Sequence, residues 1–183
     1  MKKYDLNAAK REQTGKGIGR SLRREGRLPA VLYGVGIDPV LLSLNAHELR
    51  TIIRKKETSQ PLLDLKGLDQ NVTVLLKDIQ VDPLTRDYLH ADLLKVEKDR
   101  NVRVNVPFAF TGKSKGVDMG GVLRTVRREV EVVCLPDQIP DVIEVDITEM
   151  DTGDTLHFSD LKLPEGVTLP AGGNYAVVAV RSK

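Results

Sequence analysis

The sequence predicts a mainly β fold of the α+β class, divided into two domains at residues 1–95 and 96–183. Many short apolar segments, rich in Val, Leu and Ile, are separated by glycine and proline turns. A charged linker at 96–101 precedes a half in which no long helical pattern occurs. A length of 183 residues with 40% hydrophobic content is enough for two small cores.

The first domain is expected to contain strands interrupted by two short helices. Residues 11–18 are expected to form a glycine-hinged loop and residues 19–25 a helix, because Gly26 stands where a helix C-cap belongs. A second helix is expected to begin at Asn45, which forms a capping-box pattern with Glu48. The strands are expected at 4–8, 28–33, 40–44, 61–65, 72–81 and 88–96.

One of these strands carries a pattern that bears on function. In 72–81 the alternation places Val72, Val74 and Leu76 on one face. Asp78 and Gln80 are expected to continue the same face beyond its apolar part.

The second domain is expected to be rich in β-strands, without a long helix. Alternating apolar residues make 102–110 the clearest strand of the chain, and 112–121 is expected to be a long loop. Cys134 lies inside a strand pattern and is expected in the core. Further strands are expected at 130–132, 143–147 and 175–180.

Composition restricts the cellular setting. A single cysteine allows no internal disulfide, which fits a reducing cytosol. The N-terminus lacks the apolar stretch of a signal peptide, and no apolar run approaches the about 20 residues that cross a bilayer. The glycines of the basic segment argue against a membrane-surface helix. We therefore expect a cytoplasmic protein without a membrane partner.

Charge is distributed unevenly although the net charge is only +2. Residues 1–30 contain nine Lys or Arg against three Asp or Glu, whereas residues 134–180 contain nine Asp or Glu against Lys162 alone. A dense basic strip with interspersed glycines provides charges and backbone N–H groups for phosphates, so nucleic acid is the favoured partner. The strip contains Arg11, Lys16, Arg20, Arg23, Arg24 and Arg27.

The kind of nucleic acid follows from what the sequence lacks. No helix-turn-helix, zinc-finger or basic-zipper pattern occurs, which argues against DNA. Aromatic residues for base stacking are scarce, which argues against single-stranded RNA. Structured RNA remains, and His90 and Asp92, two apart on one strand, share a face that can supply specific hydrogen bonds.

Catalysis is disfavoured. The segment 15–19 resembles a phosphate loop but lacks the spacing of known nucleotide-binding motifs. The three histidines have no second ligand at metal-binding spacing, so no metal or other cofactor is expected. A hydrolase based on His90 and Asp92 is the alternative, but the sequence offers it no evident nucleophile.

Four motifs, taken together, resemble one known family. They are Arg11-x-x-x-Gly15-Lys16-x-x-x-Arg20-x-Leu22-Arg23, Gly26-x-x-Pro29-Ala30-x-x-Tyr33-Gly34, Asp78-x-Gln80 and His90-x-Asp92. In order and spacing they are similar to the bacterial large-subunit ribosomal protein twenty-five family, which binds 5S ribosomal RNA. Residues 131–140 and Leu169-Pro170 resemble the extra domain of its long form, the CTC or general stress type.

The resemblance implies a barrel-like N-terminal domain that binds the loop E region of 5S rRNA through the minor groove, a β-rich C-terminal domain that contacts other large-subunit components, and no catalysis. Leu93 departs from the family, which usually has an aromatic residue there. The alternative is a stress-induced RNA-binding protein or RNA chaperone not stably bound to ribosomes. The residues implied in RNA binding are Arg11, Gly15, Lys16, Gly17, Arg20, Ser21, Arg23, Arg24, Tyr33, Gln80, His90 and Asp92.

Overall fold

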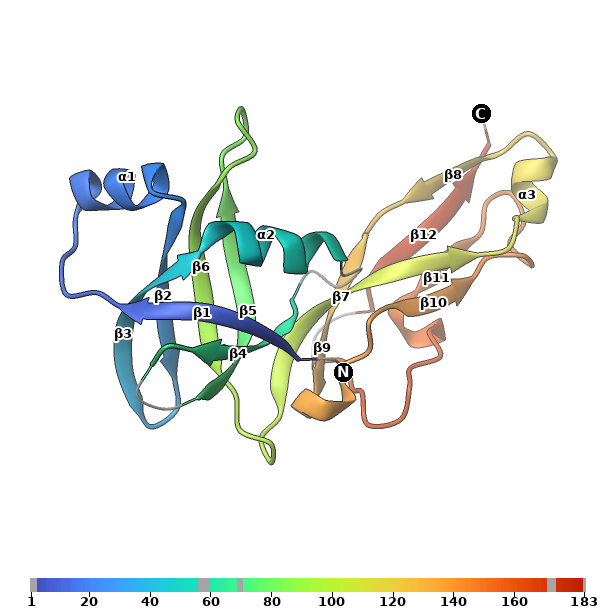
Figure 1. Cartoon of the computed structure of the whole chain (residues 1–183). Helices are drawn as coiled ribbons and strands as arrows, with labels where there is room; N and C mark the ends of the chain where they lie inside the picture. The colour runs from blue at the N-terminus through green and yellow to red at the C-terminus, as the bar shows by residue number, and fades with distance from the viewer. Residues whose placement is uncertain (1–2, 56–59, 69–70, 171–173, 183) are drawn as a thin grey trace. The chain divides into compact units, whose positions relative to one another are not determined.

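The structure is a computed structural model that describes residues 3–55, 60–68, 71–170 and 174–182. The chain divides into two compact units, residues 1–102 and 103–183 (Figure 1). Residues 96–101 connect the last strand of the first unit to the first strand of the second. Each unit has its own buried side chains and is described by itself.

The first unit is a closed barrel of six strands in the order β1-β3-β2-β6-β5-β4. The β1–β4 and β2–β6 pairs are parallel, and the other four neighbouring pairs are antiparallel. The predicted β-rich fold is therefore confirmed, and the expected strands of this unit are all present with ends that differ by up to three residues. The strands are β1 (Tyr4–Lys10), β2 (Arg27–Gly34), β3 (Ile37–Asn45), β4 (Leu62–Lys66), β5 (Val72–Val81) and β6 (Tyr88–Lys95).

Aliphatic side chains at alternate strand positions fill the barrel. In β2, Leu28, Ala30 and Leu32 are buried in the core, while Val31 and Tyr33, at alternate positions, are half-buried on the outer surface. Leu93 is fully buried among the core side chains, so its difference from the family pattern concerns packing. The fully buried side chains of this core are aliphatic, and Tyr4 and Tyr88 pack against it partly buried.

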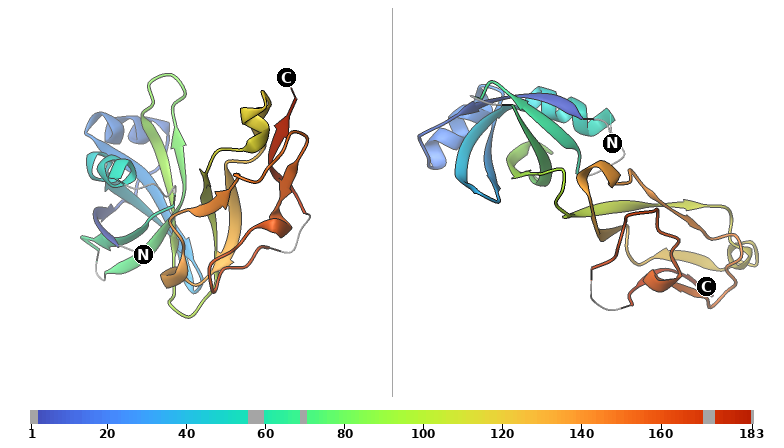
Figure 2. Two further views of the ribbon diagram at one scale, coloured as in Figure 1. Left: turned by 90° about the vertical axis from the view of Figure 1, so that its right-hand side faces the viewer. Right: turned by 90° about the horizontal axis from the view of Figure 1, so that it is seen from below.

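Two helices lie outside the ring of strands (Figures 1 and 2). Helix α2 (Ala46–Lys55) begins after Asn45, whose Oδ1 accepts hydrogen bonds from the backbone N–H groups of His47 and Glu48. Glu48 accepts from the side-chain amide of Asn45, and also from the backbone N–H and the side-chain amide of Asn7. The predicted N-cap is confirmed, and Glu48 fastens the helix to β1.

Helix α1 (Lys16–Arg24) begins three residues earlier than the sequence predicted. The expected loop therefore ends at Gly15, whose φ of 116° places it outside the helical region. Ile18 and Leu22 lie one turn apart and are both half-buried, so packing stabilises a first turn that glycine propensity alone disfavours. The helix ends one residue before the predicted end, with Glu25 as its C-cap, and Gly26 follows this cap with a φ of 73°.

A β-bulge in β5 corrects the prediction for Asp78 and Gln80. Leu76 pairs with Leu93 in the core, but the register shifts by one residue before Asp78 pairs with Asp92. The extra residue, Lys77, moves the following polar residues to the outer surface. Asp78 and Gln80 therefore lie on the face opposite to Leu76, and the expectation that they continue its face is wrong.

The second unit contains two sheets of three strands each, in the orders β10-β7-β9 and β11-β12-β8. Val104 and Val106 of β7 are fully buried, and Cys134 of β9 is buried as predicted. The region expected to be a loop at 112–121 contains a short helix, and two strands were not predicted. The elements are β7 (Val102–Thr111), α3 (Lys115–Asp118), β8 (Val122–Thr125), β9 (Glu129–Cys134), η1 (Pro136–Gln138), β10 (Ile143–Asp146), β11 (Thr155–His157), η2 (Phe158–Asp160) and β12 (Ala176–Arg181).

The two strands that were not predicted, β8 and β11, are short and contain no buried residue. In β8, Arg124 and Thr125 are both exposed, which removes the apolar alternation that marks a half-buried strand. Across the described ranges, no helix is both long and apolar enough to cross a membrane.

Candidate RNA interface

Helix α1 lies on the outer surface of the barrel against β2. Leu28 and Ala30 point into the core, so Pro29 between them points outward. Pro29 is nevertheless buried, and a Cβ atom added to Gly19 would lie 3.9 Å from its Cγ. A Cβ atom here would make an ordinary van der Waals contact with Pro29, so this part of the helix lies over the proline and covers it.

The opposite side of α1 is strongly basic. Lys16, Arg20 and Arg24 are exposed, whereas Arg23 is half-buried and its Nε donates a 2.9 Å hydrogen bond to the carbonyl of Gly19. Within the described part of α1 there is no acidic residue in the first turn. The helix thus presents a row of cations whose spacing is set by a rigid backbone.

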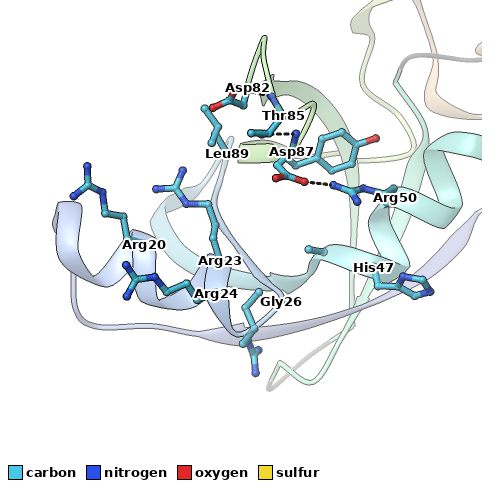
Figure 3. A pocket seen from close by; sticks show the side chains of 13 residues that line it. Arg20, Arg23, Arg24, Gly26, His47, Arg50, Asp82, Thr85, Asp87 and Leu89 are labelled. Atoms are coloured by element: carbon cyan, nitrogen blue, oxygen red, sulfur yellow. Dashed lines mark hydrogen bonds and ion pairs between the residues drawn. The ribbon is translucent and has the colours of Figure 1, made fainter.

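Three of these arginines line a cleft of about 640 Å³ (Figure 3). Arg20, Arg23 and Arg24 form one side of it, and Arg27 and Arg50 add further guanidinium groups. The cleft also receives Asp82, Thr85 and Asp87 from the β5–β6 loop.

The β5–β6 loop (residues 82–87) is held in one conformation by several contacts. Asp82 Oδ1 accepts hydrogen bonds from the N–H groups of Leu84 and Thr85. Arg50 donates to Asp87 at 2.9 Å, and its guanidinium lies 5.4 Å from the centre of the Tyr88 ring. These contacts fasten the loop to α2 and fix the wall of the cleft that faces α1.

The same contacts keep the acidic groups of the loop ionised. Hydrogen bonds from the backbone of Thr85 and Leu84 lower the pKa of Asp82. The hydrogen bond from Arg50 lowers the pKa of Asp87.

A polar patch lies on the outer surface of β2, β6 and β5. His90 Nδ1 lies 2.9 Å from Asp92 Oδ1, so the imidazole donates its Nδ1 proton to the carboxylate. Gln80 pairs across the strands with His90, and Asp78 with Asp92. We call Tyr33, Asp78, Gln80, His90 and Asp92 the outer-face patch.

Tyr33 belongs to this patch on electrostatic grounds as well. Partial burial raises the pKa of its hydroxyl, and the nearby carboxylates of Asp92 and Asp78 raise it further. The phenol therefore stays protonated and can both donate and accept hydrogen bonds. Among the residues that the structure describes, no three His, Cys, Asp or Glu side chains form a group suited to a metal ion.

The strand register connects the outer-face patch to α1. Ala30 pairs with Ala91 and Val31 with Asp92 in the parallel β2–β6 pair. One residue earlier in each strand, Pro29, which α1 covers, is level with His90. The helix and the outer-face patch therefore share one outer side of the barrel, which brings together residues about fifty to seventy positions apart in sequence.

The other residues predicted to bind RNA differ in whether they already make hydrogen bonds within the protein. Arg11 donates to the carbonyls of Leu42 and Gln13, so part of its guanidinium holds the 11–15 loop to β3. Ser21 donates to Glu25 on the next helical turn. Gly15 and Gly17 have open space where a side chain would be, which leaves their backbone accessible.

Four further residues line this region although they were not predicted to: Arg50, Asp82, Thr85 and Asp87. Residues 82–87 have the pattern D-P-x-T-x-D. Its first aspartate, Asp82, accepts from the backbone N–H groups two and three residues later, and this arrangement is typical of a turn. The pairing of Asp87 with Arg50, 37 residues away, leaves no such signal.

Comparison with known proteins assigns both units to ribosomal proteins. Residues 6–93 match the Ribosomal L25p family, and residues 101–183 match the C-terminal domain of ribosomal protein TL5. The large ribosomal subunit protein bL25 of Syntrophotalea carbinolica is 44% identical over all of this chain and 89% of its own length. The bL25 of Desulfatibacillum aliphaticivorans is 39% identical over 98% of this chain and 84% of its own length. The chain belongs to the bL25 family, in its two-domain form.

Proposed function

We propose that the chain is a structural component of the large ribosomal subunit whose N-terminal domain, residues 1–95, binds 5S ribosomal RNA. The observation that carries this proposal is the placement of the α1 arginines and the outer-face patch on one side of the barrel. The predicted target is the minor groove of the loop E region. In this role the protein is not an enzyme, and it acts in the ribosome of the cytoplasm.

The basic residues supply affinity in this proposal. Guanidinium and ammonium groups on α1 and the preceding loop contact phosphates and displace counterions. The open backbone at Gly15 and Gly17 lets the RNA approach, and Ser21 lies on the same helix. The phosphate and groove contacts are assigned to Arg11, Lys16, Arg20, Arg23 and Arg24.

The outer-face patch supplies specificity. The minor groove of an A-form helix is wide and shallow and displays 2′-hydroxyls and base edges. With Nδ1 bonded to Asp92, a neutral His90 has Nε2 left as an acceptor, and Gln80 carries both donors and an acceptor. Tyr33, Gln80, His90 and Asp92 therefore offer the hydrogen-bonding groups that such a groove requires.

The second domain is proposed to contact other components of the large subunit, proteins in particular. Its acidic stretch at 134–180 has a net charge of −8, and like charge opposes contact with RNA phosphates. Cross-links from this stretch mainly to ribosomal RNA would contradict the assignment.

A hydroxyl-radical footprint of the full chain on 5S rRNA tests the proposal directly. We expect protection of the sugars along the loop E minor groove and nowhere else on the molecule. Pelleting of ribosomes from a cell lysate tests whether the chain is stably bound to them. The proposal predicts that the chain is found in the large-subunit fraction. A chain that stays in the supernatant would favour an RNA-binding protein or RNA chaperone that is not stably bound to ribosomes.

A further inference from the structure

The second unit contains a groove of about 730 Å³ along one edge of β10. Half-buried apolar side chains, among them Leu156, Leu161 and Leu163, line it, and exposed carboxylates stand beside them. Leu156 belongs to β11, which lies at one edge of the other sheet in this unit. We call this cavity the β10 groove.

Strand β10 has an open edge on the side of the groove. Its only partner in the described part of the chain is β7, which it joins in parallel. The N–H of Ile147 donates to the carbonyl of Thr111 at the end of β7. Every second residue of a strand bonds to the same neighbouring strand, so Val145 also directs its N–H and carbonyl toward β7. The peptide groups of Glu144 and Asp146 therefore point to the open edge.

An open strand edge is a template for another strand. Four residues of β10 span about 13 Å, which accommodates a segment of four to six residues in extended conformation. The apolar lining of the groove then receives every second side chain of the added strand, because side chains alternate across a strand.

The charge of the β10 groove defines the remaining side chains of such a segment. Glu144, Asp146 and Asp160 line it, against the single cation Lys162. Hydrogen bonds from Thr148 lower the pKa of Asp146, and hydrogen bonds from His157 and Ser159 lower the pKa of Asp160. Both carboxylates are thus ionised at neutral pH, and the groove favours cationic side chains.

We propose that the β10 groove binds an extended basic peptide segment of another protein by β-strand addition. The segment alternates apolar residues, which enter the groove, with Lys or Arg residues, which face Glu144, Asp146 and Asp160. RNA is disfavoured because its phosphates would meet these carboxylates. This binding is independent of the RNA interface on the first unit.

The test uses the full chain and a synthetic peptide that alternates valine and lysine over six residues. Titration calorimetry should detect binding, and a matched peptide of alternating valine and glutamate should bind at least about tenfold more weakly. In the presence of the lysine peptide, the amide protons of Glu144 and Asp146 should become protected from hydrogen exchange. Equal binding of both peptides, or protection only at other strands, would overturn the proposal.

Two variants separate strand addition from simple charge attraction. Glu144→Pro removes an outward N–H without touching the β7 ladder and should abolish binding, whereas Glu144→Ala should weaken it only by about two- to fivefold. If Glu144→Pro fails to fold, the unmodified chain is tested with two lysine peptides instead. One is methylated on the odd-numbered backbone nitrogens and the other on the even-numbered ones. At least one of these two peptides must lose binding. Self-association that disappears in Glu144→Pro would instead identify a second copy as the occupant and contradict the choice of partner.

Discussion

His90 and Asp92 form a hydrogen-bonded pair on the outer surface of β6, with 2.9 Å between Nδ1 and Oδ1. The carboxylate can only accept, so it fixes the proton of the neutral imidazole on Nδ1. The side chain of His90 is 26% exposed and that of Asp92 is 39% exposed, so the pair is held in place and still accessible to a partner. Residues of this kind contribute specificity when they are held in one orientation before binding.

Replacing His90 with alanine should reduce discrimination between 5S rRNA and transfer RNA. The variant loses a directed hydrogen bond, so its affinity for 5S rRNA should fall by about five- to tenfold while its affinity for transfer RNA changes little. The slope of log affinity against log salt should stay the same, because no cation that contacts a phosphate is removed. An equal loss for both RNAs in filter-binding titrations would exclude a readout role for His90.

Replacing Arg20 with alanine should weaken binding to both RNAs. Arg20 is exposed on α1 and lines the cleft, so its loss removes about one phosphate contact and reduces the salt slope by about one. Arg124→Ala is the matched control, because Arg124 is an exposed arginine of β8 in the second unit. The prediction fails if Arg124→Ala flattens the salt dependence as much as Arg20→Ala does.

The sequence predicted most strands because their apolar periodicity is local information. It also placed Gln80, His90 and Asp92 in one site, and they are neighbours across the β5–β6 pair. The prediction for the face of Asp78 and Gln80 was wrong because a β-bulge depends on the partner strand. The periodicity along one strand holds no information about that partner. Helix α1 began early because Ile18 and Leu22 pack on the barrel, a tertiary effect that outweighs glycine propensity.

The elements that were missed share a physical cause. Strands β8 and β11 are short and contain no buried residue, so hydrogen bonds to β12 stabilise them without an apolar pattern of their own. The Arg50–Asp87 pair connects a helix to a loop far along the chain, and charged residues on a surface are too frequent to predict such pairs.

Gly67 and Gly36 provide a matched test of backbone constraints in the barrel. Both have positive φ, at 88° and 72°, so alanine at either position carries the cost of a left-handed conformation, about 1 kcal/mol. At Gly67 a Cβ atom would also lie 2.6 Å from the carbonyl oxygen of Ala8, whereas at Gly36 it would meet open space. Gly67→Ala should therefore lower the free energy of unfolding by about 3 kcal/mol, against about 1 for Gly36→Ala. Urea unfolding followed by amide signals of the barrel measures both, and equal losses would contradict the close approach.

The β5–β6 loop should loosen in acid. Hydrogen bonds from Thr85 and Leu84 lower the pKa of Asp82 below the 3.8 of a free aspartate. The stabilisation is therefore fully present above pH of about 4 and is lost as the pH falls through the lower pKa of the folded state. The amide resonances of Leu84 and Thr85 should shift with a midpoint below 3.8. In Asp82→Asn the amide oxygen can still accept from both N–H groups, so this titration should disappear while the loop stays closed.

The first unit alone should account for binding to 5S rRNA. Residues 1–102 carry a net charge of +5 and contain the whole barrel, α1 and the outer-face patch, whereas residues 103–183 carry −3. A fragment of residues 1–102 should therefore bind 5S rRNA within about twofold of the full chain at 0.15 M salt, where a Debye length of about 8 Å screens the acidic unit. At low salt the fragment should bind more tightly than the full chain, because the negative charge of the second unit no longer opposes the RNA. Gel-shift titrations of both proteins decide the matter: a shift by the full chain with none by a folded fragment would place essential RNA contacts in the second unit.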